Sequence, residues 1–280
     1  MKKISRRSFL AAAGLSVAAL ALTACGGSSS SVASSVASSA AASSEAASTS
    51  AAAGELTTVE AGKLTMATNA TFPPYEMTTD AGDIEGIDVD TAKAIAEKLG
   101  LELQIDDMDF DAALLSVQQG KADIAMAGIT VTDERKAVMA FSDSYATGIQ
   151  SIIVPEGSDI ASPDDLAGKK IGTQRGTTGY IYCTDDFGED SVVAYDNGLT
   201  AVQALNNGQV DAVVIDNAPA QEFIAANPGL KILDTSYAEE DYAIGMAKGS
   251  SLEDAVNAAL EELKADGTLQ SIVDKYITAE

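Results

Sequence analysis

The sequence contains no histidine and no tryptophan, and only two of its 280 residues are cysteine. Histidine is the commonest general acid or base near neutral pH and the commonest nitrogen ligand of metals. Its absence weakens most interpretations of the chain as an enzyme, although chemistry based on carboxylates or lysines stays open. The two cysteines, Cys25 and Cys183, stand in such different surroundings that we expect no disulfide framework.

Basic residues are also scarce, because 17 lysines and arginines face 42 acidic residues and leave a net charge of −25. A chain this acidic would be repelled by the phosphate backbone, so nucleic acid is excluded as a partner. The acidic stretches 106–111 and 184–190 lack the regular alternation and central glycine of a calcium loop. We therefore expect no metal and no cofactor.

The first 24 residues have a basic start and then an apolar run, which is typical of a secretory signal peptide and too short for a confident membrane span. The sequence LTAC (22–25), followed by two glycines, resembles the bacterial lipobox, whose cysteine is lipidated and becomes the mature N-terminus. The sequence SRRSFL (5–10) also resembles a twin-arginine signal but lacks the usual basic residue after it, so both export routes stay open. Residues 25–58 would then be the lipidated Cys25 and a disordered Ser/Ala linker.

From Lys63 onward, short apolar strands alternate with amphipathic helices. We predict strands at 64–68, 101–105, 123–126, 170–173 and 210–215, and helices at 88–99, 110–119 and 200–207. Two more helices are predicted at the C-terminus, the first of them opened by a capping box of Ser251 and Asp254. This alternation indicates an α/β fold of parallel-type sheets with helices on both faces.

One supersecondary unit occurs twice. ALLSVQQGKADIAMAG (113–128) matches AVQALNNGQVDAVVID (201–216), and the matched residues are 88 positions apart. Each copy is a helix, a glycine, an aspartate and a strand, so we expect two similar lobes. The first strand leads to the hydroxyl of Thr130 and to Arg135, whereas the second ends at Asp216.

Ligands bind beyond the carboxyl ends of parallel strands. If the two lobes face each other, Thr130 and Arg135 form an anion-binding wall and Asp216 supplies a carboxylate. A free amino acid carries a carboxylate and an ammonium on one carbon, which suits such a cleft.

Several ordered motifs resemble the extracytoplasmic solute-binding proteins of polar amino-acid ABC transporters, over essentially all of residues 60–278. They are KLTMATNATFPPYE (63–76), EGIDVDTAKAIAEKLG (85–100), ADIAMAGITVTDERKAVMAFSDSY (122–145), GTQRGTTGY (172–180), VDAVVIDNAPA (210–220) and ADGTLQSIVDKY (265–276). The resemblance implies a two-lobe periplasmic-binding-protein-like fold of type II, with two crossing hinge strands at 150–154 and 241–245. Lobe 1 would comprise 59–149 and 243–280, and lobe 2 would comprise 150–242.

The resemblance also implies roles for individual residues. Arg135 would bind the ligand α-carboxylate, with N–H groups from Thr130 and Thr178. The Thr130 hydroxyl would turn to the α-ammonium, which Asp216 and the carbonyl of Ala127 would also bind. The full set of expected ligand-binding residues is Asn69, Phe72, Phe110, Ala127, Gly128, Thr130, Arg135, Gln174, Thr177, Thr178 and Asp216. Phe72 and Phe110 match the aromatic positions that sandwich the ligand side chain in family members.

Two departures from the family pattern bear on specificity. Members that bind basic amino acids have an aspartate where Asn69 stands, and a neutral amide cannot compensate a buried cation. Gly128 stands where many members have serine, and Gln174 is placed to contact a polar side chain. We therefore expect an uncharged polar L-amino acid, such as glutamine or a cysteine derivative.

The expected function is capture of that amino acid and delivery to an ABC transporter permease. The protein would be a monomer without enzymatic activity, located outside the cytoplasm and anchored through Cys25 at the outer face of the cytoplasmic membrane. The alternatives are a basic amino-acid binding protein and a dehydratase-like enzyme on the same fold. A receptor or channel sensing domain would need a membrane span and a further domain after residue 280, and a structural lipoprotein would not need Arg135 and Asp216 in opposed positions.

Overall fold

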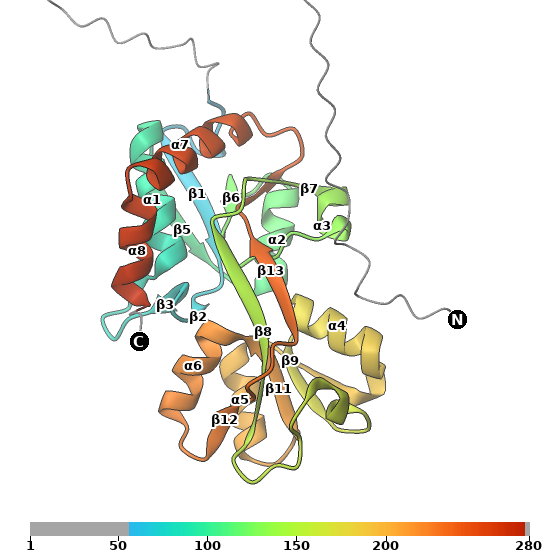
Figure 1. The fold of residues 1–280 in the computed structure, drawn as a ribbon. Coiled ribbons are helices and arrows are strands. Elements are labelled where there is room, and N and C mark those ends of the chain that lie inside the picture. Colours follow the sequence, from blue (N-terminus) through green and yellow to red (C-terminus); the bar gives the residue numbers. More distant parts are fainter. Residues whose placement is uncertain (1–55, 278–280) are drawn as a thin grey trace, which may run out of the picture. The chain divides into compact units, whose positions relative to one another are not determined.

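Lobe 1 is built around a five-stranded mixed sheet with the order β5-β1-β6-β14-β7 (Figure 1). The computed structural model describes residues 56–277, so the predictions for the signal peptide, Cys25 and most of the linker lie outside the described residues. The strands are β1 (Lys63–Thr68), β5 (Glu102–Asp107), β6 (Ile124–Ala125), β7 (Met139–Phe141) and β14 (Gly245–Ala247). A small antiparallel sheet of β2 (Thr71–Phe72), β3 (Glu76–Thr78) and β4 (Ile84–Glu85) follows β1.

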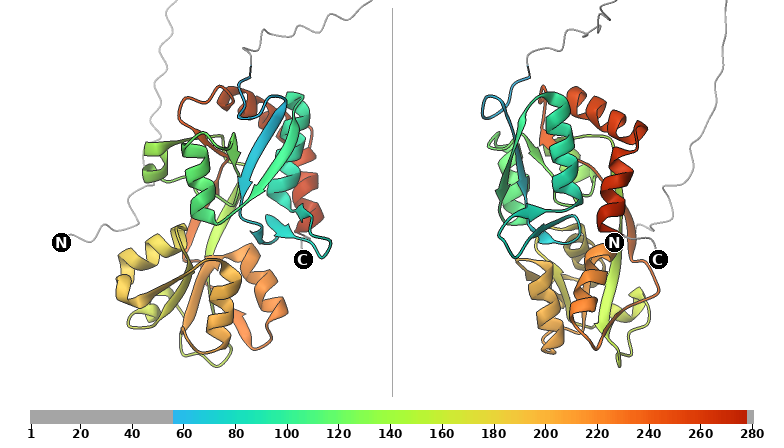
Figure 2. Two further views of the ribbon diagram at one scale, coloured as in Figure 1. Left: turned by 180° about the vertical axis from the view of Figure 1, so that it is seen from behind. Right: turned by 90° about the vertical axis from the view of Figure 1, so that its left-hand side faces the viewer.

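Helices cover both faces of this sheet. They are α1 (Ile87–Leu99), α2 (Phe110–Gln118), α3 (Asp133–Val138), α7 (Glu253–Ala265) and α8 (Thr268–Tyr276). Three of them, α1, α7 and α8, pack together over one face, and α2 lies on the other (Figure 2). The fold thus confirms the predicted α/β class.

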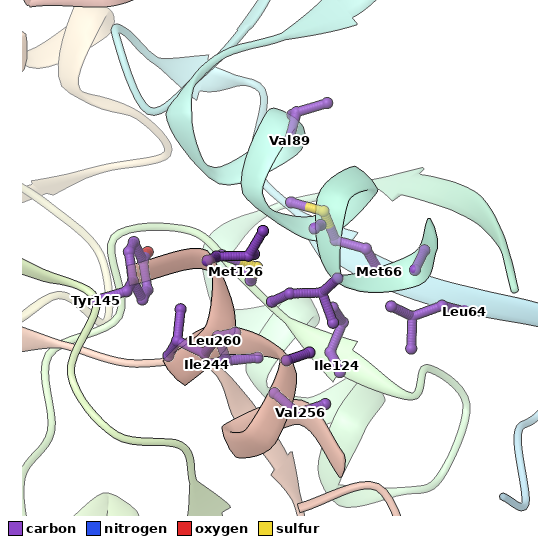
Figure 3. Close-up of a cluster of buried hydrophobic side chains, with 14 of the residues drawn as sticks. Leu64, Met66, Val89, Ile124, Met126, Tyr145, Ile244, Val256 and Leu260 are labelled. Carbon is purple, nitrogen blue, oxygen red and sulfur yellow. The ribbon is translucent and has the colours of Figure 1, made fainter. Parts of the chain in front are cut away.

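The larger apolar cluster of lobe 1 lies between the sheet and the helices α1, α7 and α8 (Figure 3). Met66 and Ile124 from the sheet meet Val256 and Leu260 from α7, and all four side chains are fully buried. The buried positions of α7 recur at intervals of three and four residues, as its sequence predicts. Each such side chain contributes roughly 1.5–3 kcal/mol on burial.

The predicted capping box at the start of α7 is wrong. A capping box of Ser251 and Asp254 requires the helix to begin at Leu252. The helix begins one residue later, at Glu253, and no side chain caps it. The Ser251 hydroxyl instead accepts a hydrogen bond from the backbone N–H of Thr57 at 3.2 Å. A contact to a distant segment has therefore replaced the local one.

Lobe 2 contains a six-stranded mixed sheet in which β10, β9, β11, β8 and β12 are neighbours in that order and β13 pairs with β8. The strands are β8 (Ala146–Pro155), β9 (Ile171–Gln174), β10 (Val192–Tyr195), β11 (Ala212–Asp216), β12 (Leu230–Ile232) and β13 (Ala238–Tyr242). Its helices are α4 (Thr178–Phe187), α5 (Gly198–Asn206) and α6 (Asn217–Ala226), with 3-10 turns η1 (Pro163–Leu166) and η2 (Glu189–Ser191). Separate apolar clusters lie on the two faces of the sheet.

Both sheets are mixed rather than purely parallel. The strands β1, β5 and β6 are parallel to one another, as are β9, β10 and β11. In lobe 1, β14 runs antiparallel to β6 and β7, and in lobe 2, β8 runs antiparallel to β11, β12 and β13. The chain leaves lobe 1 along β8 and returns to it through β13 and β14, which the local sequence pattern does not reveal.

Two strands, β8 and β13, run side by side between the lobes (Figure 1). They pair antiparallel, with Ala146 opposite Tyr242 and Gln150 opposite Ala238. The pairing therefore begins a few residues before the crossing segments predicted at 150–154 and 241–245. The predicted two-lobe fold with two crossing strands is confirmed.

Candidate ligand-binding site

A cavity of about 450 Å³, measured with the open solvent at its mouth, lies between the two lobes. It is lined by Asn69, Phe72, Glu76, Phe110, Ala127, Gly128, Thr130, Arg135, Gln150, Gln174, Thr177, Thr178, Val214, Ile215, Asp216 and Tyr242. The carboxyl ends of β1, β6, β9 and β11 supply several of these residues, where parallel sheets place ligands. All eleven residues that the sequence singled out lie around this one cavity.

Arg135 projects from the short helix α3, whose N-cap Thr132 accepts a hydrogen bond from the Arg135 backbone N–H. Its guanidinium donates to the carbonyl of Thr130 at 2.7 Å and, from lobe 1 to lobe 2, to the carbonyl of Gly176 at 3.1 Å. Only 8% of the residue is exposed, and burial lowers its pKa, which the negative charge of Glu240 opposes. An arginine has five N–H donors, so others remain for a ligand carboxylate.

The ring of Phe110 lies beside the Arg135 guanidinium, 5.4 Å from ring centre to the guanidinium carbon. The Phe72 ring stacks on Tyr75 at 5.7 Å and approaches Gly128 so closely that a β-carbon there would lie 2.7 Å from a ring carbon. Gly128 also has a φ of +55°, which favours glycine. A serine at this position would therefore require both the ring and the backbone to move.

Two threonine hydroxyls meet across the cavity, with Oγ1 of Thr130 and Oγ1 of Thr178 separated by 3.3 Å. Thr178 is the first residue of α4, and Thr177 caps that helix by accepting from the backbone N–H of Tyr180. The first N–H groups of a helix have no partner within it and favour a negative charge. The start of α4 therefore presents backbone donors toward the same cavity that Arg135 lines.

Asp216 is the last residue of β11 and the N-cap of α6. Its two oxygens accept from the backbone N–H groups of Ile149, at 2.7 Å, and Ala218, at 3.0 Å. Only 2% of the residue is exposed, and burial raises the pKa of its carboxyl to about 6, against the lowering effect of these hydrogen bonds and of Tyr242. At neutral pH the carboxylate is ionised and is held rigidly on the wall of the cavity.

Asn69 and Gln174 face each other across the lobes, and the Gln174 amide nitrogen donates to the Asn69 side-chain oxygen at 2.9 Å. Asn69 also donates to the carbonyl of Met108 at 2.9 Å and accepts from the Thr71 hydroxyl at 3.0 Å. Both residues are nearly fully buried. They give this part of the cavity a neutral, amide-rich surface.

Five lining residues were not predicted from the sequence, namely Glu76, Gln150, Val214, Ile215 and Tyr242. Glu76 is fully buried; no N–H or O–H group of the described residues donates to its carboxyl oxygens, and its hydrogen-bond partner is the carboxyl of Asp88. Burial and then the negative charge of Asp88 raise its pKa well above the usual value, which favours the protonated form of Glu76. One feature of the sequence could have indicated Glu76: it is an acidic residue at the start of a strand, directly after a loop fixed by two prolines.

Asp88 lies behind Gly128 and completes this buried acidic pair. One of its oxygens accepts from the Tyr145 hydroxyl at 2.7 Å and the other from the Gly128 backbone N–H at 3.0 Å. Burial raises its pKa to about 6, and the Tyr145 hydrogen bond acts in the opposite direction. Through Gly128, the residue fixes the turn that follows β6.

Residues 64–279 match the bacterial extracellular solute-binding proteins, family 3, and the chain belongs to this family. A probable histidine-binding protein of Neisseria gonorrhoeae is 32% identical over 96% of this chain and 95% of its own length. The L-cystine-binding protein TcyJ of Escherichia coli strain K12 is 31% identical over 79% of this chain and 85% of its own.

Solved structures share the fold. An ancestral arginine-binding protein bound to glutamine is 42% identical and superposes with a TM-score of 0.74, covering 78% of this chain and 99% of its own. Within residues 56–277, no helix is both long enough and apolar enough to span a membrane.

Proposed function

We propose that this protein captures a polar L-amino acid outside the cytoplasm between two closing lobes and delivers it to an ABC transporter permease. One observation carries the proposal: a buried arginine and a buried aspartate, Arg135 and Asp216, line the same cavity from different lobes. A ligand with a carboxylate and an ammonium would pair with both. It would then favour the arrangement in which the lobes meet, because only there are both charges close to it.

Arg135 and the N–H groups at the start of α4 would bind the ligand carboxylate, while Asp216 would bind the ammonium. This assignment is supported by the opposite charges of Arg135 and Asp216 and by the N–H donors that Arg135 retains beyond its two bonds to backbone carbonyls. The protein would bind and release its ligand without chemistry. It would act as a monomer held at the outer face of the cytoplasmic membrane by a lipid on Cys25, with lobe 1 at 59–149 and 243–280 and lobe 2 at 150–242.

We further propose that the ligand side chain is uncharged. Asn69 and Gln174 offer amide groups to it, and an amide cannot replace the hydration of a cation. Glutamine and cysteine derivatives match this chemistry. The relatives named for cystine, and the arginine-binding protein bound to glutamine, are compatible with such a ligand.

Glu76 supports a second candidate, a basic amino acid. Glu76 lines the cavity, and among residues 56–277 no N–H or O–H group donates to its oxygens, whose hydrogen-bond partner is the carboxyl of Asp88. A guanidinium or imidazolium group would donate hydrogen bonds to these oxygens and would favour loss of the proton. In that case the ligand would be arginine or histidine, and binding would release a proton from Glu76.

A thermal-shift screen tests both candidates. The protein is unfolded and refolded to remove any bound ligand, and its melting temperature is measured with each of the twenty amino acids, cystine and ornithine. A ligand that binds only the native state raises the melting temperature. A shift with one or a few uncharged polar L-amino acids supports the first candidate, and a shift confined to basic amino acids supports the second. If no α-amino acid gives a shift, the proposed function is wrong.

A further inference from the structure

Glu240 is a buried carboxylate on one of the two strands that connect the lobes. It lies in the middle of β13, opposite Gly148 of β8, and only 6% of the residue is exposed. Its neighbours Glu239 and Asp241 are exposed on the same strand. A carboxylate turned inward at this position needs partners, because burying an unpaired charge is costly.

Its partners are side chains that line the cavity. One oxygen, Oε2, accepts from the Thr130 hydroxyl at 3.0 Å and from the Gln150 amide at 2.9 Å. The other, Oε1, is buried and has no hydrogen-bond partner among the described residues. Glu240 of β13 thus forms one polar cluster with Thr130 of lobe 1 and with Gln150 of β8, the other connecting strand.

The contact with Glu240 fixes the direction of the Thr130 hydroxyl. A hydroxyl has one hydrogen to donate and two lone pairs that accept. Because an ionised carboxylate only accepts, the Thr130 hydrogen points to Glu240, and Thr178 is the donor in the 3.3 Å contact between the two threonines. The Thr130 oxygen therefore acts as an acceptor toward the cavity, which suits an ammonium and not a carboxylate.

Glu240 also balances the charge of the site. Arg135 has no carboxylate within ion-pair distance among residues 56–277, and the negative charge of Glu240 is the strongest of those that raise its pKa against burial. Arg135 and Asp216 line the cavity, and Glu240 lies behind its lining residues Thr130 and Gln150, so it adds a second negative charge close to the site. A simple carboxylic acid would bring a third negative charge, whereas an amino acid also brings a positive one.

We propose that Glu240 is a positioning residue that makes the site selective for α-amino acids over carboxylic acids that lack the amino group. It acts through Thr130, whose hydroxyl oxygen it leaves as an acceptor toward the ligand. It also acts through its own negative charge, which disfavours a ligand carboxylate that has no ammonium beside it. The inference rests on the proposed function, because it presumes that the cavity binds amino acids.

The test compares two pairs of ligands by calorimetry, L-glutamine with glutaramic acid and L-arginine with 5-guanidinopentanoic acid. Each second compound is the first without its α-amino group. Binding too weak to titrate directly is measured by competition against the amino acid. The discrimination ratio, the Kd of the analogue divided by the Kd of the amino acid, is determined for the unmodified protein, Glu240→Gln and Glu239→Gln. The last variant removes an equal charge from the exposed face of the same strand.

We expect the ratio to fall by about tenfold or more in Glu240→Gln and to stay unchanged in Glu239→Gln. A purely structural role would weaken both ligands of a pair equally, so an unchanged ratio in Glu240→Gln overturns the inference while the proposed function stands. If Glu240→Gln does not fold, Thr130→Val carries the test, and an unchanged ratio there overturns it equally. If the unmodified protein binds no amino acid, the proposed function fails and the inference fails with it.

Discussion

The side-chain amides of Asn69 and Gln174 are hydrogen-bonded across the two lobes, with 2.9 Å between the Gln174 nitrogen and the Asn69 oxygen. Asn69 follows β1 in lobe 1, and Gln174 is the last residue of β9 in lobe 2. The bond therefore forms only where the lobes meet. It also makes this part of the cavity neutral, which leads directly to a prediction about specificity.

Replacing Asn69 with aspartate is expected to shift ligand preference toward basic amino acids. In Asn69→Asp, a carboxylate would face the Met108 carbonyl, to which Asn69 now donates at 2.9 Å, and a cationic side chain would relieve that repulsion. We expect the affinity for L-arginine relative to L-glutamine to rise by about tenfold, or about 1.4 kcal/mol, in calorimetric titrations. The exposed substitution Asn207→Asp is the matched control and should leave the ratio unaltered. A ratio that also stays constant in Asn69→Asp would show that residue 69 does not determine specificity.

The affinity is expected to depend on pH through Asp216. Its pKa is raised to about 6 in the ligand-free protein, mainly by burial and also by the charge of Glu240. An ammonium favours the ionised form and would lower that pKa on binding, so binding expels a proton when the pH is below about 6. Affinity should therefore be constant above pH 7 and decrease below pH 6, by at most about tenfold per unit for this one group.

Titrations at pH 5, 6, 7 and 8 check this pH dependence. The α-carboxylate of the ligand has a pKa of about 3.5 and does not titrate in this window. Glu76 and Asp88 also lie near the cavity, so each titration is repeated in two buffers of different ionisation enthalpy to count the protons released. Equal affinity at pH 5 and pH 7 would contradict a role for ionised Asp216.

Gly176 is expected to matter for closure more than for the fold of lobe 2. Its carbonyl accepts from Arg135 of lobe 1 at 3.1 Å, its φ is +74°, and a β-carbon there would overlap the Asp111 carboxylate of lobe 1. We expect Gly176→Ala to weaken ligand binding by about tenfold, since backbone strain of about 1–2 kcal/mol is joined by a clash between lobes. Asp111→Ala in the same protein should restore the part of the affinity that the clash removes.

Gly208→Ala provides the control for this experiment. Gly208 of lobe 2 has a similar φ of +68°, and a β-carbon there would meet no atom within 4 Å. It should lower the melting temperature and leave the Kd unaltered. If Gly208→Ala and Gly176→Ala weaken binding equally, strain rather than contact between lobes explains the effect.

The duplicated unit shows how much of the fold could be predicted from the sequence. The helices α2 and α5, the glycines 120 and 208 in positive φ, and the strands β6 and β11 occupy matching positions. Asp123 and Asp211 even make the same contact, each accepting from the backbone N–H at the start of its lobe's sheet, from Thr65 at 2.8 Å and Lys170 at 2.7 Å. Local periodicity and turn chemistry predict these elements because neighbours in sequence determine them.

The residues missed by sequence analysis depend on distant segments instead. Glu76 and Tyr242 reach the cavity only because the small sheet after β1 and the strand β13 pack against the rest of lobe 1. Glu240 carries the same local pattern as its exposed neighbour Glu239, and only the alternation of β13 directs it inward. The charges at strand ends and the family motifs were sufficient to predict eleven residues that line the cavity, whereas the buried charged groups around it required the packed fold.

The most direct test of the central claim is calorimetric titration of Arg135→Ala with the amino acid that gives the largest thermal shift. Arg135→Ala would leave a ligand carboxylate unpaired in a buried site, at a cost of roughly 2–5 kcal/mol, so binding should be lost or weakened by a corresponding factor. Asp216→Ala should have a similar effect on the ammonium side. The control is Arg175→Ala, which removes an exposed arginine paired with Asp196 at 3.6 Å and should bind as the unmodified protein does. Unchanged affinity in a folded Arg135→Ala protein would contradict the account, because the cavity between the lobes would then not be the place where the ligand's carboxylate is held.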